Sequence, residues 1–188
     1  MSRVGKKPIE IPAGVEVKIE GQKVIVKGPK GELSKEIRPE IKVEIKENKV
    51  LLSPQTIITI STRERKKIPA FWGLFRALIF NMIKGVTAEF EKKLEIEGVG
   101  FKAVIEGENL VLSVGYSHSV KIKIPKDIKV LVEKNTITVS GTNKELVGQF
   151  AATIRKTKPC EPYKGKGIKY LGEQIRRKAG KKVVTTKG

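Results

Sequence analysis

Apolar and polar residues alternate with a period of two along much of the chain. Such alternation is typical of strands that bury one face. The alternating segments come in pairs, and each pair is joined by a short turn with glycine or asparagine, which adopt positive φ at little cost. The pattern predicts antiparallel hairpins at four turns, Glu20-Gly21-Gln22, Glu47-Asn48, Gly107-Glu108-Asn109 and Lys134-Asn135.

Two segments have a helical period instead. The first carries an apolar stripe on one helix face, and Pro69 and Gly85 are expected to open and close this helix. The second begins with a capping-box spacing at Thr142 and reaches its limit at Pro159. Both stripes are interpreted as core. The first stripe consists of Phe71, Leu74, Phe75, Leu78, Ile79, Met82 and Ile83.

The hairpins are repeated within the chain. The segment 41–53 matches the segment 128–140 without a gap. A competing register aligns Gly28 with Gly141 and is about as good residue by residue. We prefer the first register because it places a helix directly after the matched hairpin in both halves.

These elements predict an α+β fold with two similar duplicated domains and a basic C-terminal tail. Each domain is expected to be an antiparallel sheet of short strands packed with one helix, because a small sheet needs such a cover for its apolar face. The predicted boundaries are 1–84, 85–158 and 159–188. Removal of the tail from Pro159 onward is expected to leave both domains folded.

The charge balance narrows the function classes. Across 188 residues, 39 Lys and Arg stand against 20 Asp and Glu, for a net charge of +19. Such a surface attracts nucleic acid or an anionic membrane. No apolar run approaches the ~20 residues that span a bilayer, no signal-type apolar region follows Met1 to Pro8, and the basic tail has no amphipathic stripe. Nucleic acid in the cytoplasm is therefore the favoured partner.

Catalytic and metal chemistry lack the necessary residues. Cys160 and His118 are the only residues of their kinds, so an intrachain disulfide and a cysteine zinc cluster are not possible, and the strand-like setting of His118 argues against a Ser-His-Asp triad. His118 falls in a strand-like stretch and is expected to face solvent or form a hydrogen bond. The carboxylates show no paired arrangement. We expect no enzyme, no cofactor and no small-molecule substrate.

The densest charge lies in residues 155–188, where twelve Lys or Arg face two Glu. Charge alone fits a solvated tail equally well. Three features favour RNA contact. Glycines alternate with cations between Glu161 and Tyr170, so backbone amides can approach phosphates. Two tyrosines are placed to stack on a base or ribose, and Pro159 and Pro162 stiffen the approach to the segment.

Residues 161–170 resemble the C-terminal motif of the bacterial form of the family of ribosomal large-subunit protein six. The likeness extends over essentially the whole chain and includes 2–8, 11–15, 98–103 and 115–118. The segment 55–68 is unusual for that family, so no contacts are carried over to it.

The resemblance implies a duplicated α+β fold without enzymatic activity. It also implies binding to 23S rRNA near its 3′ domain, by the sarcin–ricin loop and the base of the factor-recruiting stalk, beside neighbouring large-subunit proteins. The residues expected to bind RNA, from the resemblance and the charge run together, are Lys158, Tyr163, Lys164, Gly165, Lys166, Gly167, Lys169, Tyr170, Arg176, Arg177, Lys178, Lys181 and Lys182.

Other interpretations stay open on sequence alone. A general nucleic-acid-binding or RNA-chaperone module outside the ribosome would show the same charge. The basic cluster 63–67 fits a solvated loop or an extra phosphate contact equally well. Trp72 and Phe80 lie off the first apolar stripe and have no assigned partner. The sequence Gly28-Pro29-Lys30-Gly31 matches a KH-type loop, but it follows a predicted strand and is better interpreted as a hairpin turn.

Overall fold

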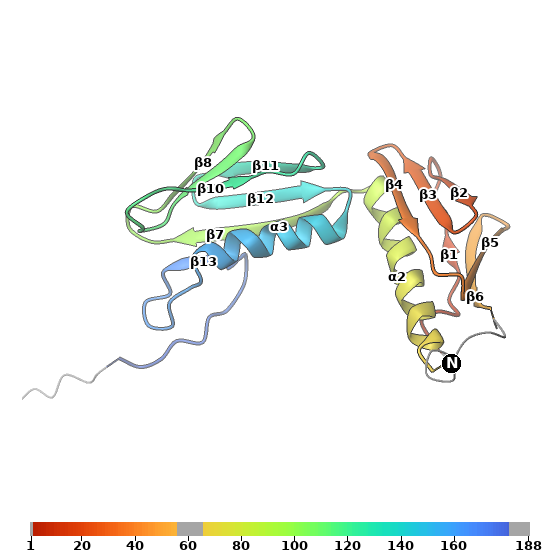
Figure 1. The fold of residues 1–188 in the computed structure, drawn as a ribbon. Coiled ribbons are helices and arrows are strands. Elements are labelled where there is room, and N and C mark those ends of the chain that lie inside the picture. Colours follow the sequence, from red (N-terminus) through yellow and green to blue (C-terminus); the bar gives the residue numbers. More distant parts are fainter. Residues whose placement is uncertain (1, 56–65, 181–188) are drawn as a thin grey trace, which may run out of the picture. The chain divides into compact units, whose positions relative to one another are not determined.

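The computed structural model describes residues 2–55 and 66–180. They form two compact units (Figure 1). The first contains the described residues up to Phe90 together with Thr142–Lys144, and the second contains Glu91–Gly141 and the described residues from Glu145 onward. Each unit has antiparallel sheets and one long helix, which confirms the predicted α+β fold with internal duplication. No helix in the described ranges is long and apolar enough to cross a membrane.

The first unit packs two three-stranded sheets with one helix. One sheet has the order β1-β6-β5, and the other has the order β2-β3-β4. Helix α2 contacts β3, β4, β5 and β6. The bounds are β1 Ile9–Glu10, β2 Glu16–Glu20, β3 Lys23–Gly28, β4 Gly31–Glu36, β5 Ile41–Lys46, β6 Lys49–Pro54 and α2 Ile68–Thr87.

The second unit repeats this plan and adds a strand. Its sheets have the orders β10-β9-β8 and β11-β12-β7-β13. The core of this unit contains residues from both sheets and from helix α3. The bounds are β7 Phe90–Glu97, β8 Lys102–Glu106, β9 Asn109–Ser113, β10 Val120–Lys123, β11 Ile128–Glu133, β12 Thr136–Gly141, α3 Lys144–Thr157 and β13 Gly167–Tyr170.

Equivalent hydrogen bonds relate the two units. The Ile11 amide donates to the Asn48 carbonyl at 3.0 Å, and the Ile96 amide donates to the Asn135 carbonyl at 2.8 Å. Each bond joins the first strand of its unit to the turn of the hairpin that precedes the helix. The structure therefore supports the preferred register. The competing one fails because β3, which ends at Gly28, continues into another strand, whereas β12 continues into a helix.

The predicted hairpin turns are confirmed. Gly21 and Gly107 have φ of 60° and 58°, and Asn48 has φ of 61°. Glu47 and Lys134 also adopt positive φ, at 46° and 52°, which is uncommon for such residues. The segment 28–31 is a hairpin turn as expected, since Gly28 pairs with Gly31 where β3 meets β4.

Helix α2 corrects two details of the prediction. It continues through Gly85, which is buried within it, and ends at Thr87. Its buried face also passes through Trp72, whose side chain is 8% exposed, while Leu74 on the predicted stripe is 50% exposed. Trp72 belongs to the core of the first unit, and its indole Nε1–H donates to the Leu52 carbonyl at 2.8 Å. Phe80 is 43% exposed, beneath the Arg76 guanidinium.

Part of the predicted tail is built into the second unit. Strand β13 pairs antiparallel with β7, and Ile168, opposite Ile96, is fully buried. Removing the chain from Pro159 onward therefore strips a core residue from the second unit. The structure therefore argues against the prediction that this truncation leaves both domains folded, and we expect it to destabilise the second unit.

Candidate nucleic-acid interface

The segment between α3 and β13 is a closed loop, which we call the C-terminal loop (residues 158–168). At its base, the Ile168 amide donates to the Lys158 carbonyl at 2.9 Å. Within it, the Glu161 amide donates to the Lys166 carbonyl at 2.8 Å, and the Gly165 amide donates to the Glu161 carbonyl at 3.0 Å. These bonds fix the backbone, so the loop presents a defined surface.

The two glycines of the loop are required by the conformation and close packing of its backbone. Gly165 and Gly167 have φ of 74° and 142°, a region that side chains disfavour. A Cβ on Gly167 would lie 2.6 Å from the Cys160 Cα, and one on Gly165 would lie 3.2 Å from the Arg177 guanidinium. Both glycines are buried, and the Gly165 amide is already bonded to Glu161. Close packing thus explains them, in place of amides aimed at phosphates.

The exposed side of the loop carries the side chains suited to RNA. Tyr163 is 53% exposed, and Lys164 and Lys166 face solvent beside it. The next cations, Arg176, Arg177 and Lys178, are also exposed, and the Lys178 amide donates to the Pro162 carbonyl at 2.9 Å. That bond holds the basic run against the loop, so the two groups of cations share one surface. Lys181 and Lys182, also predicted to bind RNA, lie outside the described residues.

Two other predicted contacts are engaged within the protein. The Lys169 ammonium forms ion pairs with Glu97 and, at 3.4 Å, with Glu95, and only 16% of the side chain is exposed. The hydrogen bond that the Lys169 ammonium donates to the Glu97 carboxylate is the main reason that the pKa of Lys169 is raised. Tyr170 is half-buried, with the Arg155 guanidinium 5.5 Å from its ring centroid. Both side chains hold β13 in place.

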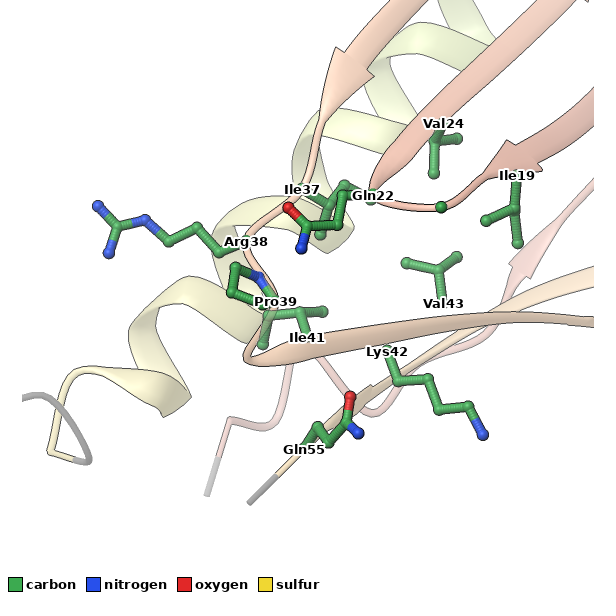
Figure 2. Close-up of a pocket in the computed structure, with 11 residues that line it drawn as sticks. Ile19, Gln22, Val24, Ile37, Arg38, Pro39, Ile41, Lys42, Val43 and Gln55 are labelled. Carbon is green, nitrogen blue, oxygen red and sulfur yellow. The ribbon is translucent and has the colours of Figure 1, made fainter. Parts of the chain in front are cut away.

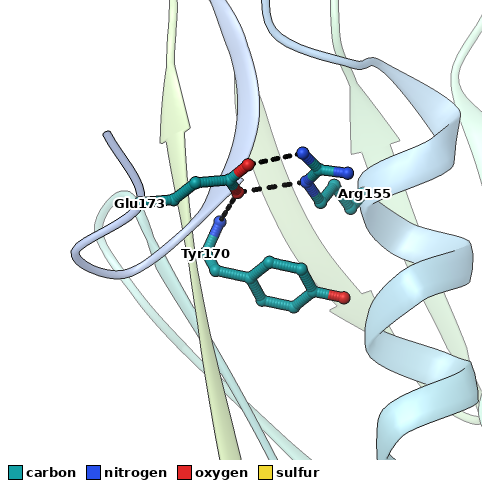
Figure 3. A network of polar contacts seen from close by, with 3 residues as sticks. All are labelled: Arg155, Tyr170 and Glu173. Atoms are coloured by element: carbon teal, nitrogen blue, oxygen red, sulfur yellow. Dashed lines mark hydrogen bonds and ion pairs between the residues drawn. The ribbon is translucent and has the colours of Figure 1, made fainter. Parts of the chain in front are cut away.

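A polar network fixes the chain directly after β13 (Figure 3). The Glu173 carboxylate accepts hydrogen bonds from Arg155 Nε at 3.1 Å, Arg155 Nη2 at 2.5 Å and the Tyr170 amide at 3.0 Å. The paired guanidinium is the main cause of the lowered pKa of Glu173. Glu173, one of the two acidic residues of the basic tail, is therefore structural, and it sets the direction in which residues 174–180 leave the sheet.

A second group of aromatic side chains adjoins the C-terminal loop. The Tyr116 hydroxyl donates to the Thr157 carbonyl at 2.9 Å, and the Lys158 ammonium lies 4.6 Å from the Tyr116 ring centroid. His118 stacks on Tyr116 at 6.3 Å between ring centroids and is exposed in the loop between β9 and β10. The predicted strand at His118 is thus wrong, although its solvent-facing position is confirmed. Sequence reasoning missed Tyr116 and His118 as site residues, although their motif was noted.

Tyr116 and Lys158 line a hollow of about 480 Å³. Aromatic faces beside ammonium groups suit an unpaired base with its phosphate. Among the described residues, no group of His, Cys, Asp or Glu is arranged to hold a metal ion. The hollow is lined by Phe101, Gly115, Tyr116, Lys158, Pro159, Glu161 and Lys166.

The first unit has less of this chemistry. One of its hollows, of about 350 Å³, lies among strand and turn residues, and its lining includes Ile19, Val24 and Val43 (Figure 2). Arg38 and Lys42 also belong to its lining. In the basic cluster 63–67, Lys66 and Lys67 are exposed, and the remaining residues lie outside the described ranges. Of these two hollows, the one in the second unit combines aromatic rings with lysines.

Comparisons with known proteins point to one family over nearly the whole chain. A family model described as ribosomal protein L6 matches residues 11–89 and 97–171, one segment for each repeat. The chain is 51% identical over 183 residues to large ribosomal subunit protein uL6 of Campylobacter jejuni, covering 96% of this chain and 98% of the relative. It is 52% identical over 189 residues to uL6 of Chlamydia felis, covering 100% of both.

Proposed function

Because the chain belongs to the ribosomal protein L6 family, a family of non-enzymatic structural components of the large ribosomal subunit, we propose that its second unit binds 23S rRNA through the C-terminal loop and the adjoining basic run. The binding region proposed is the 3′ domain, by the sarcin–ricin loop and the stalk base, where neighbouring large-subunit proteins are its partners. The observation that carries the proposal is the C-terminal loop itself, whose backbone is fixed by hydrogen bonds while Tyr163, Lys164 and Lys166 face outward.

The mode of binding follows from these residues. Exposed Lys and Arg side chains neutralise phosphates, which gives affinity and orientation with little base specificity. A preformed loop loses little entropy on docking. Tyr163 and the Tyr116–His118 pair add stacking surfaces for unpaired bases. Recognition therefore depends on the shape of the folded RNA.

The test measures affinity for a 23S rRNA fragment containing the 3′-domain helices. Replacing Lys164, Lys166, Arg176 and Arg177 by Gln should reduce the slope of log affinity against log salt by about 3, since each neutralised phosphate contributes about 0.7–0.9. The matched control changes charge equally in the first unit, at Lys6, Lys23, Lys30 and Lys49, which are all exposed. Equal losses in both variants would show that net charge alone drives binding and would overturn the proposal.

A general RNA-binding module outside the ribosome is separated by sedimentation. A ribosomal component stays with the large subunit through a high-salt wash, whereas a loosely bound module is stripped from it.

A further inference from the structure

The outer edges of the two equivalent first strands differ. In the second unit, β7 lies between β12 and β13, and Ile168 of β13 is fully buried. In the first unit, β1 is the edge of its sheet, in the order β1-β6-β5. Beside β1, the structure has a groove of about 560 Å³, lined by residues 8–12 and by the C-terminal half of α2, including Phe80 and Ile83.

The open edge retains backbone groups able to pair. The Ile11 amide donates to the Asn48 carbonyl in the turn before β6, and Ile9 is paired with Val50 of β6. Alternate residues of an antiparallel strand direct their backbone groups to opposite sides, so the N–H and C=O of Glu10 face away from β6. Glu95 is the equivalent position in β7, since Ile96 corresponds to Ile11, and Glu95 is paired with Lys169 of β13.

The side chains around the groove are of the same kinds as those that bind β13 and the chain after it in the second unit. Glu10 is exposed and has no ion-pair partner within residues 2–55 and 66–180, whereas Glu95 is paired with the Lys169 ammonium. On the helix side, Arg76 and Lys84 line the groove, and in the second unit Arg155 of α3 binds Glu173, three residues beyond β13. Phe80 offers an apolar wall that is 43% exposed.

We propose that the groove beside β1 is a strand-addition site for an extended segment of another protein. The segment has a cation opposite Glu10, apolar residues on both sides of that cation, and a carboxylate a few residues later for Arg76 or Lys84. It pairs antiparallel with β1, as β13 pairs with β7, through the outward backbone groups of Glu10. The inference does not depend on the RNA-binding proposal, because it concerns the other unit.

The probe is a peptide with the sequence of residues 166–175, added to the isotope-labelled full chain and followed by NMR. We expect saturable shifts at Glu10, Phe80 and Ile83, with slower hydrogen exchange of the Glu10 amide. Shifts confined to β7 would mean that the peptide exchanges with β13, and no binding at millimolar peptide would mean that the edge is closed. Peptide-free shifts of the groove that depend on protein concentration would point to a second copy as occupant. Each of these three results overturns the proposal.

Backbone methylation supplies the matched control. In β13, the Ile168 and Tyr170 amides bond to Lys158 and Glu173, away from β7, so the Lys169 amide faces β7. A peptide methylated at the nitrogen equivalent to Lys169 should bind about tenfold more weakly, because a strand hydrogen bond is lost and a carbonyl is left unpaired. Methylation at the nitrogen equivalent to Ile168 should change the affinity little. Equal affinities of the two peptides would exclude strand addition.

A protein variant tests the same bond from the other side. Glu10→Pro removes an outward N–H and leaves the β1–β6 bonds intact, whereas Glu10→Ala keeps that N–H. The Pro variant should bind the peptide about tenfold more weakly than the Ala variant. Spectra of both variants without peptide show whether the first unit remains folded. If the Pro variant is unfolded, the methylated peptides test the proposal on the unchanged protein.

Discussion

The two units share a strand order and a covering helix, yet their outer edges differ. The first unit ends its sheet at β1, and its helix is anchored within the core by Trp72. The second unit extends its sheet with β13, and the C-terminal loop is formed by the chain that connects α3 to this strand. The comparison indicates that the surface proposed to bind RNA forms where the second unit closes its edge. Four experiments test this, in order of expected effect.

Ile168→Ala should have the largest effect. The side chain is fully buried between β7 and the core of the second unit, so its truncation should lower the free energy of unfolding of that unit by about 3 kcal/mol. Hydrogen exchange resolved by residue should show the loss in the second unit and little change in the first. Val99→Ala, at a side chain that is 89% exposed, is the control. An equal loss of unfolding free energy in both units would mean that β13 does not stabilise the second unit in particular.

Trp72→Phe is the counterpart in the first unit. It removes the indole N–H that donates to the Leu52 carbonyl and leaves that carbonyl without this donor. The free energy of unfolding of the first unit should fall by about 1–2 kcal/mol. Denaturant unfolding followed by probes in each unit measures the effect, with Phe80→Leu as an exposed aromatic control. Destabilisation of the second unit instead would contradict the assignment of Trp72 to the first core.

Glu173→Gln tests the network behind β13. Its lowered pKa means that the unfolded chain binds a proton more readily, so the ionised carboxylate stabilises the folded state above its ordinary pKa of 4.5. That contribution is lost as the pH falls through the lower folded-state pKa. The variant should be less stable than the wild type by about 1 kcal/mol at neutral pH, a modest value because water screens the partly exposed pair. Unfolding at a series of pH values should show this difference shrinking below 4.5. A constant difference would exclude the ion pair as its cause.

Lys166→Ala and Lys169→Ala compare two lysines of one segment. Lys166 faces solvent, whereas the Lys169 ammonium is paired with Glu95 and Glu97. Replacing Lys166 should reduce the salt slope of rRNA binding by about 1, and replacing Lys169 should leave it nearly unchanged. Filter binding over a range of salt concentrations measures both slopes. The reverse order would show that Lys169 leaves its carboxylates to bind RNA.

The sequence predicted the hairpins and both helices because period and turn chemistry are local. It placed Leu74 on the buried face and left Trp72 without a partner, since the side of a helix that packs on a sheet is set by tertiary contacts. The sequence showed the run of Lys and Arg in the tail, but it did not show which of them face solvent and which pair with carboxylates. Whether a lysine faces solvent, as Lys164 does, or two carboxylates, as Lys169 does, depends on the register of β13 with β7, and that register pairs residues 70 to 76 positions apart.

The same long-range pairing imposes an order on biosynthesis. The described strands of the first unit and its helix α2 all lie before Ala88. This unit can therefore close while the second unit is still being made. Helix α3 and the two sheets of the second unit must wait for Ile168 to be synthesised before their core is complete. The loop proposed to meet rRNA is shaped by the same event, so an unfinished chain does not yet present that surface.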